Sequence, residues 1–203
     1  MGTGRTPLLV VLSGPSGVGK DSVIRELRNC IDDMHFAVTA TTRPPRPGET
    51  PGQSYHFVTQ DEYDHMLDRG ELLAPAEVHG YWYGAPVDSI RRELQANRDV
   101  LLQIDVQGAM QVRRRYPQAV FIFLAPSSTR GLVERLRARH TESQEQFRRR
   151  VADAEFEMAQ LPQYDYVVVN REDDLEGAVR SVACIIHAER LRVSRQPVRL
   201  LPN

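Results

Sequence analysis

Lysine is almost absent from this chain, cysteine is scarce, and neither sign of charge is in excess. Of the 203 residues, 26 are basic and 27 are acidic, which gives a formal net charge of -1. This balance argues against a nucleic acid or an anionic membrane as partner, because both attract proteins with surplus positive charge. With 41% hydrophobic residues at this length, we expect one domain around one sizeable core.

The two cysteines, Cys30 and Cys184, lie far apart and have no companion at metal-ligand spacing. They give no sign of a disulfide framework or a zinc site, and we interpret them as buried thiols. Long apolar runs are also missing: residues 8–12 are too few to span a membrane and lack the layout of a signal peptide. A cytoplasmic location is therefore expected.

Apolar runs alternate with helical periodicities along most of the chain. Runs that are apolar at every position are typical of strands buried on both faces of a parallel sheet. The alternation therefore predicts an α/β fold with a mostly parallel sheet flanked by helices. The strands expected are residues 8–12, 100–102, 120–124 and 167–169, and the helices that follow them run through Ile31, Met110, Leu136 and Leu191.

Residues 36–90 have a different texture, with shorter alternating strands around a stretch rich in proline and glycine. Within it, Thr59 and Glu62 have the spacing of a capping box, which predicts the start of a short helix. This segment is interpreted as an insertion beside the main sheet. A second insertion is expected in the polar residues 140–146, between two arginine-rich helices.

A glycine-rich loop follows the first apolar run and precedes the first helix. It reads Gly14-Pro15-Ser16-Gly17-Val18-Gly19-Lys20. In this strand–loop–helix setting the backbone N–H groups converge on an anion at the positive end of the helix. The pattern predicts a nucleoside triphosphate site of the P-loop type.

Lys20 is the single lysine, and the other 25 basic residues are arginines. A flexible ammonium can follow the β- and γ-phosphates as a point charge, whereas a planar guanidinium would crowd the loop. Asp21 stands where a serine or threonine hydroxyl normally holds Mg²⁺, and Ser22 follows. Either Asp21 is the metal ligand, or it is a charge that favours the helix start while Ser22 supplies the hydroxyl.

Residues 41–49 hold two arginines, Arg43 and Arg46, on a proline-stiffened stretch with Glu49 beside them. Such a fork suits bidentate capture of a phosphate that is not transferred, although a solvated basic turn would look the same. With this stretch the sequence resembles the guanylate kinases. That family has a P-loop, Thr-Thr-Arg-x-Pro-Arg-x-Gly-Glu, Tyr-Gly, Asp-x-Gln-Gly and an arginine-rich lid. In this chain the P-loop is residues 14–20, the Thr-Thr-Arg stretch is residues 41–49, the Tyr-Gly pair is residues 83–84 and the Asp-x-Gln-Gly stretch is residues 105–108. The lid arginines are Arg135, Arg139 and Arg150.

The resemblance, which covers residues 8–194, implies a P-loop NTPase-type sheet with a small mixed insertion for the nucleoside monophosphate and a helical arginine-rich lid. It implies a core of residues 1–35, 91–130 and 151–203, an insertion of 36–90 and a lid of 131–150. The implied activity is Mg²⁺-assisted transfer from ATP to GMP or dGMP, in a monomer or small homo-oligomer. On the acceptor side, the resemblance implies that the phosphate is held by Arg43, Arg46, Tyr55 and Tyr83, with Glu49 orienting the two arginines. It implies that the guanine is contacted by Thr39 and Asp105. In the lid, it implies that Arg135 and Arg150 close over the phosphates being exchanged and that Arg139 lies along the adenine.

The match departs from the family around the guanine base. Guanylate kinases generally offer a glutamate and a hydroxyl there, and these positions are Ala74 and Ala85 in this chain. Glu77 would face the other way on a regular strand unless a bulge intervenes. Gln103 stands where the family usually carries a further aspartate, and His140 replaces a lid glycine.

Two alternatives remain open. Ribose 1,5-bisphosphate kinases share the fold, lack the guanine pair and carry a Gly-Lys-Asp loop like residues 19–21, but they lack the complete two-arginine clamp. A non-catalytic guanylate kinase-like binding module is the other, although such modules usually lose the phosphate loop. The lid arginines also have a plain interpretation, because Arg135 and Arg139 are four apart and could share a solvated helix face.

Overall fold

The computed structural model describes residues 5–78, 80–128, 131–132 and 144–200. Its central element is a five-stranded sheet in which every pairing is parallel. The strand order is β2 (Met34–Ala37), β7 (Asp99–Gln103), β1 (Leu9–Ser13), β8 (Val120–Pro126) and β9 (Tyr166–Asn170). The expected parallel sheet is confirmed, with strand ends that differ from the expected ones by one or two residues.

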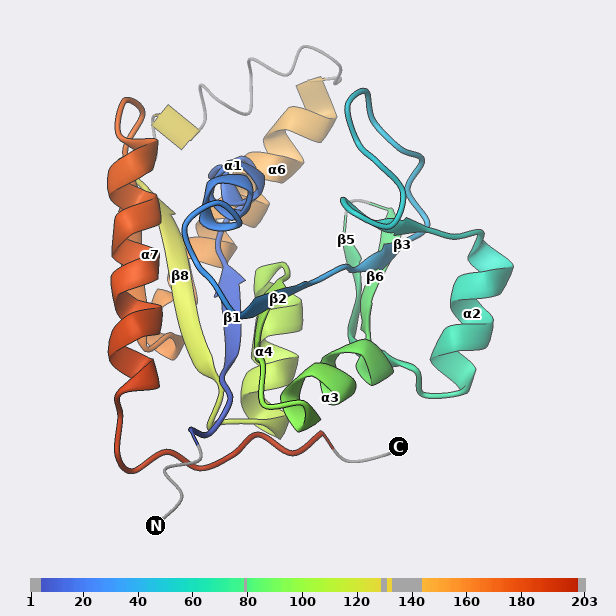
Figure 1. Ribbon diagram of the computed structural model, residues 1–203. Coiled ribbons are helices and arrows are strands. Elements are labelled where there is room, and N and C mark those ends of the chain that lie inside the picture. Colours follow the sequence, from blue (N-terminus) through green and yellow to red (C-terminus); the bar gives the residue numbers. More distant parts are fainter. Residues whose placement is uncertain (1–4, 79, 129–130, 133–143, 201–203) are drawn as a thin grey trace.

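Helices cover both faces of this sheet (Figure 1). Because successive side chains of a strand point to opposite faces, the apolar residues of β1 divide between two core layers. Val10 and Leu12 pack with α1 (Lys20–Leu27) and α7 (Leu175–Arg190), whereas Leu9 and Val11 face α3 (Val87–Gln95) and α4 (Val106–Arg115). Each side chain buried in this way contributes about 1.5–3 kcal/mol.

A second, four-stranded sheet lies beside the first and is mixed, as expected for the insertion (Figure 1). Its order is β4 (His56–Phe57), β3 (Ala40–Thr41), β6 (Tyr81–Pro86) and β5 (Leu72–Val78). α2 (Gln60–Asp68) packs on it through the fully buried Tyr63. The helix starts at the predicted capping box: Thr59 Oγ1 accepts from the Glu62 N–H, and the Glu62 carboxylate accepts from the Thr59 N–H.

Two further expectations have different outcomes. The cysteines are reduced but exposed, so the prediction that Cys30 and Cys184 are buried is wrong. Cys30 lies in the turn after α1, and Cys184 lies on α7. The helix expected through Leu136 lies outside the described residues, apart from its first turn at 131–132. None of the helices in the described ranges is long and apolar enough to cross a membrane.

Candidate active site

The phosphate loop joins β1 to α1, and two of its glycines are required by close contacts. Gly14 has φ +149°, and a Cβ there would lie 2.2 Å from the carbonyl oxygen of Leu124 on β8. Gly19 has φ +99°, and a Cβ would lie 2.6 Å from Nδ2 of Asn170. Any other residue at these positions would push the loop away from the neighbouring strands.

Asn170 also holds the loop directly. It is the last residue of β9 and is 5% exposed, and its Nδ2 donates to the carbonyl oxygen of Val18 at 2.8 Å. Lys20, at the first position of α1, bends back so that its Nζ donates to the carbonyl oxygens of Gly14 at 2.6 Å and Pro15 at 3.2 Å. The ammonium therefore lies over the loop, where a phosphate bound by the backbone N–H groups would meet it.

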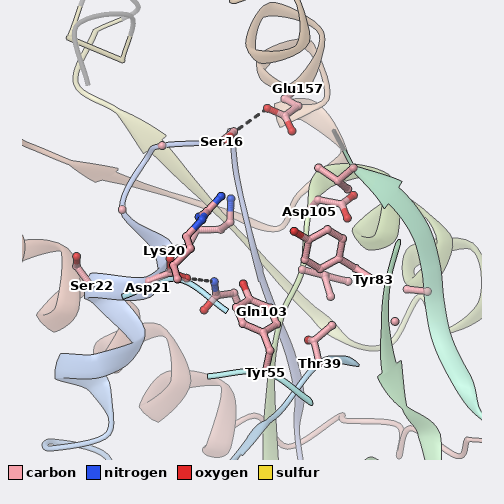
Figure 2. Close-up of a pocket in the computed structure, with 17 residues that line it drawn as sticks. Ser16, Lys20, Asp21, Ser22, Thr39, Tyr55, Tyr83, Gln103, Asp105 and Glu157 are labelled. Carbon is pink, nitrogen blue, oxygen red and sulfur yellow. Dashed lines mark hydrogen bonds between the residues drawn. The ribbon is translucent and has the colours of Figure 1, made fainter. Parts of the chain in front are cut away.

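A cavity of about 210 Å³ opens between this loop and the second sheet (Figure 2). It brings together most of the residues that the sequence singled out, from segments more than 80 positions apart. The expected site residues that line it are Ser16, Gly17, Gly19, Lys20, Asp21, Ser22, Thr39, Arg46, Tyr55, Tyr83 and Asp105, joined by Ala74, Val78, Gly84, Gln103, Ile104 and Glu157. Donor and acceptor candidates thus share one cavity.

The two arginines of the expected clamp occupy different environments. Arg46 lines the cavity, whereas Arg43 does not line it and is only 6% exposed. Glu49 joins them: one carboxylate oxygen accepts from Arg43 Nη2 and the other from the Arg46 backbone N–H, each at 2.7 Å. The Arg43 guanidinium also lies 5.3 Å from the centroid of the Tyr55 ring. Arg43 is thus held by its ion pair with Glu49 and by its contact with the Tyr55 ring.

These contacts set the protonation of the acceptor side. Partial burial tends to raise the pKa of Glu49, but the hydrogen bonds from Arg43 and Arg46 outweigh it and lower that pKa below its ordinary value. Glu49 therefore remains a carboxylate. Burial, and then the nearby charge of Asp21, raise the pKa of Tyr55 above its ordinary value, so that its hydroxyl remains a neutral donor.

Asp105 lines the cavity and also caps the helix that follows it. It is the N-cap of α4, and its Oδ1 accepts from the Gly108 N–H at 2.9 Å. Thr39 lines the same cavity from the segment between β2 and β3 and is 5% exposed. The guanine-facing pair implied by the family resemblance is therefore present at one cavity, with one Asp105 oxygen engaged by the helix.

Ala74 and Ala85 were both expected to face the acceptor base, and only Ala74 lines the cavity. β5 bulges between Leu73 and Ala76, which gives Ala74 a left-handed φ of +53°. Ala85 is 0% exposed and does not line the cavity, although it packs in the same core layer as Ala74, with α3 and α4. The expectation that Ala85 faces the base is therefore wrong. The bulge does not turn Glu77 inward: this side chain is exposed and pairs across from Trp82.

One cavity residue was missed by the sequence analysis. Glu157, on α6 (Gln144–Ala159), accepts a hydrogen bond from the backbone N–H of Ser16 at 3.1 Å, so that a carboxylate occupies one donor of the phosphate loop (Figure 2). Burial raises the pKa of Glu157, and nearby Lys20 opposes this rise. No local signal in the sequence pointed to it, because Ser16 lies 141 positions away.

The lid predictions fall largely beyond the described part of the chain. Arg135 and Arg139 lie outside the described residues. Arg150 belongs to the backbone of α6, the helix that also carries Glu157.

Comparison with known proteins gives a consistent result. The family model for guanylate kinase matches residues 6–189. A guanylate kinase of Desulfitobacterium hafniense is 44% identical over 190 residues, covering 94% of each chain. That of Nitrosomonas europaea is 46% identical over 191 residues, with 94% of each chain covered. Among solved structures, guanylate kinase from Anaplasma phagocytophilum superimposes with a TM-score of 0.79 at 31% identity, covering 95% of this chain and 90% of that one.

Proposed function

The chain belongs to the guanylate kinase family, and we propose that it is an ATP:GMP phosphotransferase that converts GMP or dGMP to the diphosphate. The observation that carries the proposal is the shared cavity. Phosphate-loop residues such as Lys20 line it together with acceptor-side residues such as Arg46 and Tyr55. Donor and acceptor phosphates bound there would be neighbours, which is the main requirement of phosphoryl transfer.

The transfer is direct and in line. An oxygen of the GMP phosphate forms a bond to the terminal phosphorus of ATP, the bond from that phosphorus to its bridging oxygen breaks, and ADP leaves with the electron pair. The attacking oxygen already carries negative charge, so no general base is needed. Catalysis then consists of alignment and neutralisation of charge, which we assign to Lys20 and the lid arginines Arg135 and Arg150, with Arg139 along the adenine.

On the acceptor side, the GMP phosphate is held by Arg46, Tyr55 and Tyr83, backed by Arg43. The Arg43–Glu49 pair supports this assignment, because the carboxylate that fixes Arg43 also accepts from the Arg46 backbone and so holds the turn in shape. Thr39 and Asp105 are assigned to the guanine, where hydroxyl and carboxylate oxygens can meet its donors.

Magnesium is the expected metal with ATP. Mg²⁺ usually reaches a protein through one or two side chains plus nucleotide phosphates and waters. The cavity is compatible with this mode of coordination, since Asp21 and Ser22 both line it. Among the described residues there is no cluster of three or more acidic, histidine or cysteine side chains that could hold a metal ion by themselves. When bound, the ion would neutralise charge on the phosphates. We assign Asp21 as its protein contact.

We place the enzyme in the cytoplasm, in purine nucleotide metabolism and GMP recycling, acting as a monomer or small homo-oligomer on small-molecule substrates. The direct test is a coupled assay of ADP release with ATP against GMP, dGMP, AMP, UMP and ribose 1,5-bisphosphate, with Lys20→Ala as the inactive control. Release with GMP and dGMP is expected. Release with ribose 1,5-bisphosphate alone would replace the proposed acceptor, and release with none would favour a binding module.

A further inference from the structure

The acidic residue near the metal position is on a different element from the usual one. P-loop enzymes commonly place a hydroxyl after the loop lysine and an aspartate on a neighbouring strand, and these hold Mg²⁺ together. Here Asp21 follows Lys20, and an amide, Gln103, ends β7. β7 is the strand beside β1, with Gln103 in register with Leu12. The carboxylate is therefore on the loop side, and the strand carries a neutral side chain.

The two side chains meet directly. Nε2 of Gln103 donates to Oδ1 of Asp21 at 2.6 Å, and both residues line the cavity beside Lys20 (Figure 2). This distance is at the short end for an N–H···O contact, as expected when the acceptor is charged. The bond engages one carboxylate oxygen and holds Asp21 on the first turn of α1, on the cavity side, which leaves Oδ2 for a ligand.

The chemistry of the pair explains why an amide at position 103 suits an aspartate at position 21. An aspartate at position 103 would place a second carboxylate within hydrogen-bond distance of Asp21, and two such charges repel strongly until a cation separates them. An amide removes the repulsion and adds a donor. A serine at position 21 with glutamine at 103 would leave neither side chain charged.

We propose that Gln103 is a positioning residue that orients the Asp21 carboxylate toward the magnesium–nucleotide complex, and that the pair exchanges the usual loop hydroxyl and strand carboxylate. The proposal rests on ATP being the donor, as proposed above. It makes Asp21 a conditional ligand: with Mg²⁺ the carboxylate favours the nucleotide, and without it the same charge repels the phosphates.

A double-mutant cycle tests the exchange in the full-length protein. The variants are Asp21→Ser, Gln103→Asp and the combined change, which restores the usual arrangement. Affinity for ATP, without acceptor, is measured by calorimetry in excess Mg²⁺ and in EDTA. In the parent, Mg²⁺ is expected to tighten binding about tenfold or more. Asp21→Ser should reduce this gain to about threefold or less, mostly by strengthening metal-free binding.

Gln103→Asp should weaken metal-free binding about tenfold, because two carboxylates then face the phosphates. The combined variant should return to within about threefold of the parent's Mg²⁺ dependence. Gln60→Asp is the matched control: Gln60 Nε2 donates to Asp64 Oδ1 at 2.8 Å on α2, away from the cavity. It places the same two charges together and should leave ATP binding unchanged.

A merely structural hydrogen bond gives a different result. Gln103→Leu would then lower the melting temperature while the Mg²⁺ dependence of ATP affinity stayed as in the parent, and that outcome overturns the proposal. A combined variant that keeps the raised Mg²⁺ dependence of Gln103→Asp would overturn it as well. The two proposals fail separately. Recovery of the Mg²⁺ dependence in the combined variant without turnover of GMP would remove only the acceptor assignment, whereas turnover of GMP without that recovery would remove only the exchange.

Discussion

Ala74→Glu should sharpen the choice of guanine over adenine. Ala74 lines the cavity, and alanine offers nothing to the N1–H and N2–H groups of guanine. A glutamate there would accept from both, whereas adenine presents an acceptor at N1, which the carboxylate repels. The backbone already has φ +53° with a Cβ in place, so glutamate adds little strain to that which alanine bears.

The magnitude follows from the two hydrogen bonds. A hydrogen bond to a charged group contributes about 1.5–3 kcal/mol, and ordering a glutamate side chain costs about 1.5–2 kcal/mol. A net gain of about 1–4.5 kcal/mol follows, so the ratio of kcat/KM for GMP over AMP should rise by about fivefold or more. The assay is coupled ADP release with each acceptor at subsaturating concentration.

Ala85→Ser is the control that separates the two alanines. Ala85 is 0% exposed in the core, so the new hydroxyl would be buried. An unpaired hydroxyl costs about 1–3 kcal/mol, which lowers the melting temperature of a domain of this size by roughly 2–10 °C. The GMP:AMP ratio should not change. A rise in that ratio with Ala85→Ser, and none with Ala74→Glu, would refute our placement of the bulge in β5.

Lys20→Ala should lower kcat by two or more orders of magnitude, about 2.7 kcal/mol, because the ammonium that stabilises the transferred phosphoryl group is lost. The melting temperature should not change. Stopped-flow or coupled assays measure kcat and thermal unfolding measures stability, and unchanged turnover would contradict the assignment. Arg46→Ala should raise the KM for GMP about tenfold and leave that for ATP alone. Arg43→Ala should raise the KM for GMP and also lower stability, because Glu49 loses a charged partner that is only 6% exposed. A selective loss of ATP affinity in Arg46→Ala or Arg43→Ala would mean that the donor and acceptor sides are reversed. Glu157→Gln should tighten ATP binding at neutral pH, since an ionised carboxylate no longer competes for the Ser16 N–H. Burial raises the pKa of Glu157, so the contribution of Glu157 to stability is complete below its ordinary pKa and is lost as the pH rises through its raised pKa. The melting temperature of the variant, measured between about pH 4 and pH 8, should therefore vary less with pH than that of the parent.

The sequence by itself determined the features that depend on neighbouring residues. Continuous apolar runs predicted strands buried on both faces, and this is confirmed for β1, β7 and β8. The prediction is wrong for β9, an edge strand whose Val167 and Val169 are exposed. The glycines of residues 14–20 fixed the loop, because its backbone leaves no room for a Cβ at Gly14 and Gly19. The capping box at Thr59 closed as predicted, since its two partners are three residues apart.

Only the tertiary structure decided which distant side chains meet. Gln103 and Asp21 are 82 positions apart, and Glu157 and Ser16 are 141 apart, so no local pattern links them. Their contacts depend on the parallel order β7-β1-β8, which brings the carboxyl end of β7 beside the loop that follows β1. The bulge in β5 is equally non-local: an extra residue opposite β6 turned Ala74 to the cavity and left Glu77 in solvent, while pairing with Leu73 kept Ala85 in the core. Strand register is set by the pairing partner, and a single sequence does not contain that partner's position.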